Sequence, residues 1–175
     1  MTHLMIDLET LALQPNAVIM QVGVCEFEMQ DTEVGRIAQY ELDPSDQLYA
    51  GRRMDMNTVN WWMGQSDIAR KSVFGPREKV MTPDIFINEF HQDWQWGMYE
   101  GVWSHGSMFD LVILEDFYFN FDAKVPWHYR VPRDTRTLFA LANHHYKGTK
   151  HTALEDAVLQ SKACQEAWKK LFPPR

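Results

Sequence analysis

Two acidic residues two positions apart, Asp7 and Glu9, are the pair whose spacing most directly predicts chemistry in this sequence. They follow the apolar residues Leu4 and Ile6 in an alternating pattern, which predicts a β-strand with both acids on one face, ~6.6 Å apart. Two-metal sites hold their ions ~3.5–4 Å apart, and one carboxylate commonly bridges them. Because Mg²⁺ prefers oxygen ligands, the pair predicts a metal site at the end of a first, central strand.

The same spacing recurs at Asp31-Thr32-Glu33, where it is typical of a solvated turn. The difference lies in the context, since only Asp7 and Glu9 follow an apolar strand. On spacing and context alone, a functional role and a purely structural role for this pair therefore stay equally open.

Two further acids, Asp110 and Asp156, lie in the predicted first turns of helices. Ser107 and Thr152 stand at the positions of N-caps, and the helix dipole favours ionised carboxylates just after them. A capping role explains Asp110 as well as a functional role does. Glu155 fills the capping position of the other helix, which leaves Asp156 available for a different function.

His151 precedes Asp156 by five residues and lies just outside the predicted helix. An imidazole in that position can accept a proton from a metal-bound water near neutral pH. The chain has seven histidines, and His105 stands in the same relation to Asp110. A lone histidine is more often a surface or structural residue, and that alternative stays open for His151.

The elements expected around these residues alternate between strands and helices. Three strands in succession are followed by helices that alternate with two more strands, which predicts an α/β fold with a mixed sheet flanked by helices. The predicted strands cover residues 4–8, 18–28, 34–42, 101–104 and 127–131. The predicted helices cover residues 58–63, 67–73, 107–121, 134–145 and 153–171, and another begins at Thr82-Pro83.

Three local patterns refine this prediction. Asp43-Pro44-Ser45-Asp46 is expected to interrupt the chain after the third strand. Ser66 is the expected N-cap of the helix over residues 67–73. On the last helix a stripe of small residues with one tryptophan predicts close packing on the sheet, and it consists of Ala157, Ser161, Cys164 and Trp168.

The composition predicts one globular domain over residues 1–175. The chain is 45% hydrophobic, which excludes a disordered protein, and it has no apolar run near the ~18 residues of a membrane span. Its net charge of −7 argues against a protein that coats nucleic acid through a broad basic face. It does not argue against an enzyme whose carboxylates hold cations. Because no targeting segment is recognisable, we expect a cytoplasmic protein without membrane contact.

Together, these motifs resemble those of the DEDDh 3′–5′ exonucleases of the ribonuclease H-like superfamily. Asp7-Leu8-Glu9-Thr10 is similar to the first motif, the stretch from Ser104 to Asp110 to the second, and His151 through Asp156 to the third. The likeness extends to a subgroup of T-even phage exonuclease A proteins and mycobacterial-type exoribonucleases. It rests there on Thr58-Val59-Asn60-Trp61-Trp62 and on Arg133-Asp134-Thr135-Arg136-Thr137, and it covers nearly the whole chain.

The resemblance implies a five-stranded mixed sheet whose second strand is antiparallel, and a site for two Mg²⁺ or Mn²⁺ ions. The implied metal ligands are Asp7, Glu9, Asp110 and Asp156, with Asp7 bridging the ions. His151 would be the general base. The implied reaction is hydrolysis of terminal phosphodiesters at a single-stranded 3′ end, with release of nucleoside 5′-monophosphates.

The implied substrate contacts follow the first motif and the adjacent tryptophans. Thr10 and Leu11 would line the pocket for the end nucleotide, with Leu11 against its base. Trp61 and Trp62 are about 100° apart on a predicted helix, so we expect one of them to stack on a base, a contact worth ~1–3 kcal/mol. The alternative is that both are core residues. Many relatives have an Asn within the stretch that corresponds to residues 105–107, where this chain has His, Gly and Ser. The resemblance therefore implies no substrate contact for these three residues.

The sequence leaves alternatives open for the substrate, the function and the oligomeric state. DNA is favoured over RNA because of the phage-type likeness, and an exoribonuclease of the same family is the alternative. The second hypothesis is a non-catalytic nucleic-acid-binding module, which should have lost at least one of the four acids or the histidine. The third hypothesis is a metal-stabilised structural protein. Many relatives form pairs, so the resemblance allows a homodimer.

Overall fold

The computed structural model describes residues 1–148 and 151–173, and a six-stranded sheet of order β4-β3-β2-β1-β5-β6 lies at its centre. The strands are β1 (Thr2–Thr10), β2 (Ile19–Glu28), β3 (Val34–Leu42), β4 (Val80–Met81), β5 (Gly101–Ser104) and β6 (Pro132–Asp134). β2 is antiparallel to both β1 and β3, whereas the other neighbours pair in parallel. The α/β class with an antiparallel second strand is therefore confirmed.

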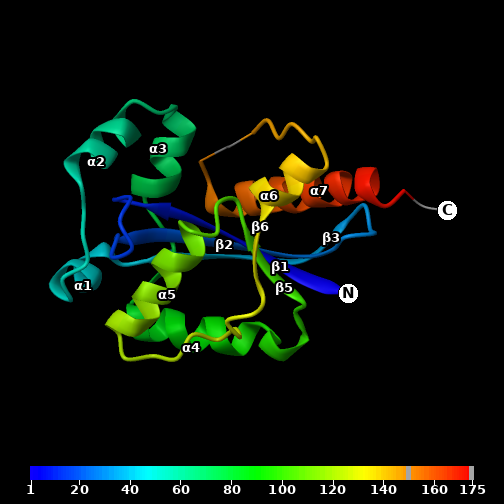
Figure 1. Ribbon diagram of the computed structural model, residues 1–175. Coiled ribbons are helices and arrows are strands. Elements are labelled where there is room, and N and C mark those ends of the chain that lie inside the picture. The colour runs from blue at the N-terminus through cyan, green and yellow to red at the C-terminus, as the bar shows by residue number, and fades with distance from the viewer. Residues whose placement is uncertain (149–150, 174–175) are drawn as a thin grey trace.

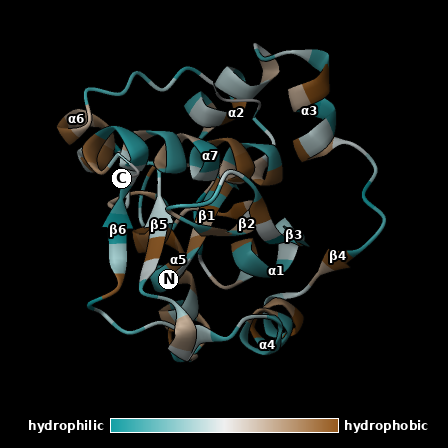
Figure 2. Ribbon diagram, turned by 90° about the vertical axis from the view of Figure 1, so that its right-hand side faces the viewer, coloured by the Kyte–Doolittle hydropathy of each residue, from teal (hydrophilic) through white to brown (hydrophobic). Residues whose placement is uncertain are grey.

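Helices cover both faces of this sheet. They are α1 (Pro44–Tyr49), α2 (Met56–Met63), α3 (Asp67–Phe74), α4 (Pro83–Asp93), α5 (Asp110–Asn120), α6 (Thr135–Leu141) and α7 (Ala153–Leu171), with a 3₁₀ turn at Trp96–Met98. Figures 1 and 2 show α6 and α7 on one face and α4 and α5 on the other. In Figure 1, α2 and α3 lie near the end of the sheet where α7 begins.

The alternation of β1 divides the buried apolar residues between the two faces. Leu4, Ile6 and Leu8 pack with residues of α4 and α5, whereas Met5 packs with residues of α6 and α7. A third cluster joins Leu11 to residues of β2, α2 and α3 at the end of the strand. In the predicted stripe of α7, Ala157, Ser161 and Cys164 are buried, as predicted, whereas Trp168 is half-buried.

The predicted strand over residues 127–131 and the predicted count of five strands are wrong. The last strand begins at Pro132, because the preceding segment packs on α5, where the Trp127 indole N–H donates to a Glu115 carboxylate oxygen at 2.9 Å. The sixth strand, β4, has only two residues, which is too short for an alternating pattern to predict it.

Two predicted helix boundaries also need correction. Ser107 does not cap α5: its backbone N–H donates to Asp134, and the helix begins at Asp110. The expected break at residues 43–46 is confirmed, since β3 ends at Leu42, and this segment also begins α1, where the Asp43 carboxylate caps the helix and Pro44 is its first residue. The helix predicted over residues 134–145 ends at Leu141. Ser66 is the N-cap of α3, as predicted.

Within residues 1–148 and 151–173, no helix combines the length and the apolarity that crossing a bilayer would require.

Candidate active site

Asp7 and Glu9 lie on the face of β1 that α7 covers, opposite to the face of Leu4, Ile6 and Leu8. The Asp7 carboxylate is held by α7, because the Gln160 amide nitrogen donates to its Oδ1 at 2.8 Å. Gln160 is itself only 2% exposed. One Asp7 oxygen is thus oriented toward the helix.

Asp110 reaches the same strand end from α5. It is the first residue of that helix, it is buried, and its Oδ1 accepts a hydrogen bond from the Leu8 backbone nitrogen at 3.2 Å. This bond runs to the residue between Asp7 and Glu9. The chain thereby brings together acids that are more than 100 positions apart.

A glycine on β2 lets the first turn of α7 approach the sheet. Gly23 is the cross-strand partner of Asp7. A Cβ atom added to Gly23 would lie 2.1 Å from the carbonyl carbon and oxygen of Ala153. Only a residue without a side chain fits under the helix at this point, and the close approach carries Asp156, in the same first turn, over β1.

Replacing Gly23 by Ala is therefore expected to displace the start of α7 and to lower catalytic activity by about 10²-fold, since small misplacements at a site have such effects. Steady-state assays on a labelled oligonucleotide measure the loss. Gly97→Ala is the matched control, because a Cβ at Gly97 meets no atom within 4 Å. Equal activity of the two variants would contradict the role of this contact.

His151 lies immediately before α7 in a conformation that residues other than glycine rarely adopt. Its φ is 56°, and its backbone nitrogen donates to Asp156 Oδ2 at 2.9 Å. Its ring lies edge-on to Trp61 and Trp62, with ring centroids 5.2 and 5.9 Å away. This constrained turn aims the imidazole at the carboxylates, and backbone strain of this kind is often concentrated at functional sites.

The four carboxylates repel one another. Burial raises the pKa of Asp7 well above its usual range, and the charges of Asp110, Glu9 and Asp156 raise it further. Burial, Asp156 and Asp110 raise the pKa of Glu9 to about 8. Burial also raises the pKa of Asp110 to about 7, against the lowering effect of the Leu8 hydrogen bond. Because burial and mutual repulsion disfavour the ionised form of these acids, a bound positive charge is needed to keep them ionised together.

These raised pKa values predict how stability depends on pH when no cation is bound. Unfolded carboxylates titrate near pH 4, whereas Glu9 and Asp110 release their protons near pH 8 and 7 in the folded protein. The folded state binds more protons between these limits, so the free energy of unfolding is expected to fall as the pH rises from about 5 to 8. Melting temperatures in EDTA measure this, and Glu9→Gln should flatten the profile. A melting temperature that rises over this range would contradict it.

The donor set fits a divalent cation. Glu9, His151 and Asp156 each offer one ligand atom, and these three atoms lie within 4.8 Å of one another. Asp7 and Asp110 lie close enough to raise the pKa of their neighbours. Clustered carboxylate oxygens are the ligands that Mg²⁺ and Mn²⁺ prefer, and an imidazole is also accepted by Mn²⁺ and Zn²⁺.

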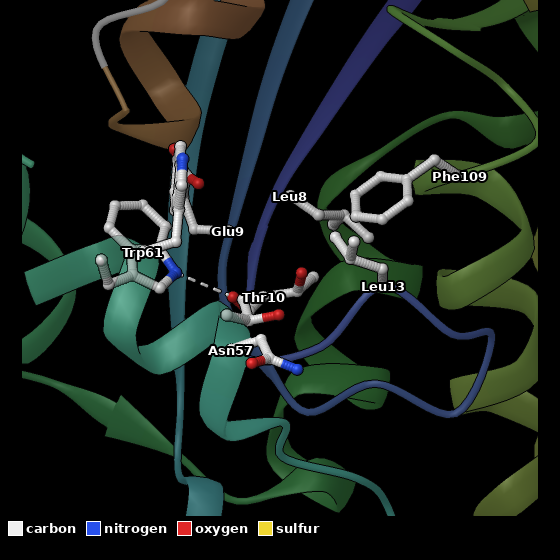
Figure 3. A pocket seen from close by; sticks show the side chains of 9 residues that line it. Leu8, Glu9, Thr10, Leu13, Asn57, Trp61 and Phe109 are labelled. Carbon is white, nitrogen blue, oxygen red and sulfur yellow. Dashed lines mark hydrogen bonds between the residues drawn. The ribbon is translucent and has the colours of Figure 1, made fainter. Parts of the chain in front are cut away.

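A pocket of about 360 Å³ opens beside Glu9, lined by Leu8, Glu9, Thr10, Leu13, Asn57, Thr58, Trp61, Trp62 and Phe109. Figure 3 shows Leu8, Leu13 and Phe109 on one side and Trp61 on the other. This volume lies in the range of roughly 300–1,000 Å³ that small-molecule sites occupy. The pocket offers apolar walls next to the carboxylates.

The four residues expected to contact substrate have different positions. Thr10 lines the pocket. Trp61 lines it and is 48% exposed, whereas Trp62 is 1% exposed and its indole N–H donates to the Thr10 carbonyl at 3.0 Å, the dashed line in Figure 3. Leu11 is 4% exposed and packs in the core with Trp62, outside the lining of the pocket. Leu13 occupies the pocket wall instead.

The sequence interpretation gave no site role to several residues that the structure brings to this site, among them Gln160, Leu13 and Phe109. Gln160 follows Asp156 by four positions, so its place on the same face of a helix was a usable signal. Leu13 and Phe109 carry no comparable signal, because both lie outside regular elements and reach the pocket through the path of their loops.

Comparisons with known proteins agree with this architecture. The model of the family described as 3′-5′ exoribonuclease Rv2179c-like domain matches residues 2–168. An exodeoxyribonuclease of Enterobacteria phage T4 is 29% identical over an alignment of 130 residues, and the match covers 66% of this chain and 55% of the phage protein. The chain thus spans little more than half of that relative.

The fold is similar to that of solved exonuclease I structures. The zinc-bound form of the E. coli exonuclease I–single-stranded DNA complex matches 99% of this chain and 41% of its own, with a TM-score of 0.68 and 15% identity. The same enzyme in complex with a dA16 oligonucleotide matches 99% of this chain and 42% of its own, with a TM-score of 0.68 and 14% identity. The ribonuclease H-like fold class is thereby confirmed.

Proposed function

The chain belongs to the Rv2179c-like 3′–5′ exoribonuclease domain family, and on this premise we propose that residues 1–175 act as a single 3′–5′ exonuclease domain. The substrate is the 3′ end of a single-stranded nucleic acid. One observation carries the proposal: four carboxylates and an imidazole converge at the end of β1, beside a pocket with apolar walls. No purely structural role requires this repulsive arrangement.

The carboxylates are the proposed ligands of two Mg²⁺ or Mn²⁺ ions, as the resemblance of the motifs implies. Asp7, Glu9, Asp110 and Asp156 would hold them. When bound, such cations supply Lewis-acid activation of water and neutralise charge that develops on the phosphate and the leaving oxygen. Gln160 and the Leu8 backbone nitrogen orient Asp7 and Asp110, so that the ligand set is preorganised.

His151 is the proposed general base, which accepts a proton from the attacking water. Its ring is held by edge contacts with Trp61 and Trp62, and one of its ring nitrogens lies near the oxygens of Glu9 and Asp156. An imidazole takes up a proton efficiently near neutral pH.

The pocket beside Glu9 is the proposed position of the end nucleotide. Trp61 is the tryptophan that stacks on a base, because it is exposed at the pocket wall, whereas Trp62 supports it from the core. Leu13 is better positioned than Leu11 to contact the base, and Thr10, which also lines the pocket, is the proposed contact to the sugar. Cleavage next to this nucleotide would release a nucleoside 5′-monophosphate.

DNA is the preferred substrate in this proposal, and RNA is the second candidate. The T4 relative is an exodeoxyribonuclease, and two of the matching solved structures are complexes with single-stranded DNA or a dA16 oligonucleotide. The description of the family itself names exoribonuclease activity, which is the observation that favours RNA. A direct comparison of the two sugars is therefore part of the test.

The test uses DNA and RNA oligonucleotides of one sequence, labelled at the 3′ or the 5′ end, with Mg²⁺ or with EDTA. We expect 3′-labelled strands to release labelled mononucleotide at once and 5′-labelled strands to give a descending ladder, faster for DNA and only with the metal. Binding without cleavage would identify a binding module instead. Mg²⁺-dependent stabilisation with neither binding nor cleavage would identify a structural protein.

A further inference from the structure

Arg136 is a cation next to the candidate active site that the proposed mechanism does not use. It is the second residue of α6 and is exposed. Among residues 1–148 and 151–173, its guanidinium group takes part in no hydrogen bond or ion pair. An arginine near carboxylates that stays unpaired retains all its donors for a ligand.

The guanidinium group of Arg136 lies against Gly106. A Cβ atom on Gly106 would lie 3.2 Å from the Arg136 Cζ and 3.4 Å from each of the two terminal nitrogens. These nearly equal distances mean that the guanidinium plane lies face-on across the glycine. Gly106 also has a φ of 112°, a conformation that favours glycine. The turn thus supports the face of the guanidinium group and leaves its N–H edges available.

The charge of Arg136 acts on the active-site side of this turn. It lowers the pKa of Asp110 against the stronger effect of burial, and it lowers the pKa of His105 on the same turn. Arg136 does not line the pocket beside Glu9. The guanidinium group therefore lies near the carboxylate cluster but away from the proposed position of the end nucleotide.

We propose that Arg136 binds a phosphate of the strand upstream of the scissile bond, an inference that rests on the proposed function. A protein with a net charge of −7 and four clustered carboxylates needs a local cation to attract a polyanion. The planar fork of arginine matches two phosphate oxygens at once, which lysine cannot do. The face-on contact with Gly106 leaves the edges of that fork open to a phosphate.

The test compares Arg136→Gln with Arg133→Gln, which removes the same charge three residues earlier. Arg133 is exposed, its guanidinium donates to backbone carbonyls of Arg130 and Pro132, and its charge acts on His3 at the opposite end of β1. For Arg136→Gln we expect KM to rise about tenfold, the loss of one charge-assisted contact, with kcat little changed. Arg133→Gln should resemble the wild type, and Arg136→Lys should be intermediate.

Two further measurements separate phosphate binding from a structural effect. Binding of a labelled oligonucleotide, measured with Ca²⁺ to prevent hydrolysis, should lose about 0.7 from its logarithmic salt dependence in Arg136→Gln. Uncharged methylphosphonate linkages, introduced one at a time upstream of the scissile bond, should weaken wild-type binding at one position. At that position the same linkage should not weaken the binding of Arg136→Gln any further.

The outcomes distinguish this inference from the proposed function. If the wild type releases nucleotides but Arg136→Gln behaves like Arg133→Gln, Arg136 has no such role. If every methylphosphonate weakens both proteins equally, the contact is not to a phosphate. If the wild type releases no nucleotide under any metal condition, the proposed function itself fails.

Discussion

Replacing Asp7 by Asn is expected to lower the rate of nucleotide release by about 10³-fold or more, which corresponds to about 4 kcal/mol of transition-state stabilisation. Asp7 interacts electrostatically with all three other acids of the cluster. Asn keeps the shape of the side chain and the oxygen that accepts the Gln160 hydrogen bond, but it offers no negative charge to a cation. Single-turnover assays with a 5′-labelled oligonucleotide and Mg²⁺ measure the loss.

The same substitution should stabilise the metal-free protein, because it removes one of the repelling buried charges. The melting temperature in EDTA should rise. The stabilisation by Mg²⁺, about 2.7 kcal/mol at a concentration 100-fold above Kd, should shrink. Asp31→Asn is the control, since Asp31 belongs to an exposed acidic pair of the same spacing. A lower melting temperature in EDTA with undiminished Mg²⁺ stabilisation would show that Asp7 is not a ligand.

Replacing His151 by Asn is expected to lower kcat by about 10²- to 10⁴-fold, the usual contribution of a general base. Asn is preferable to Ala in this test, because the φ of 56° at His151 lies in the left-handed region, which Asn tolerates. The four carboxylates remain in the variant, so Mg²⁺ should stabilise it as it stabilises the wild type. Rapid-quench assays and melting curves measure the two properties separately.

His145→Asn is the control for this experiment, since His145 is exposed and lies six residues earlier. The alternative role of His151 is that of a ligand, because its ring nitrogen is near the oxygens of Glu9 and Asp156. If His151→Asn lost its Mg²⁺ stabilisation as fully as Asp7→Asn, His151 would be a ligand rather than the base.

Sequence reasoning was most successful where a residue's position follows from a local period. The alternation around Leu4, Ile6 and Leu8 predicts which face of β1 carries Asp7 and Glu9, and the structure has them on that face. The helical period of α7 likewise predicts its buried stripe. In both cases the pattern is long enough to determine one orientation.

The features that it missed depend on tertiary packing rather than on a period. Leu11 and Leu13 are two residues apart with similar chemistry, and only the path of the loop after β1 buries one and exposes the other at 69%. The expected strand at Trp127 is overridden by a hydrogen bond to α5. Gly23 carries no motif, and its importance appears only when the backbone of Ala153 is found against it.

The most direct test of this account is the position of bound cations in crystals soaked with Mn²⁺, determined from the anomalous scattering of the metal. We predict two peaks at the end of β1. Together, the carboxylate oxygens of Asp7, Glu9, Asp110 and Asp156 should lie within coordination distance of the two ions. Peaks elsewhere on the protein, with the four carboxylates contacting only one another or water, would contradict it.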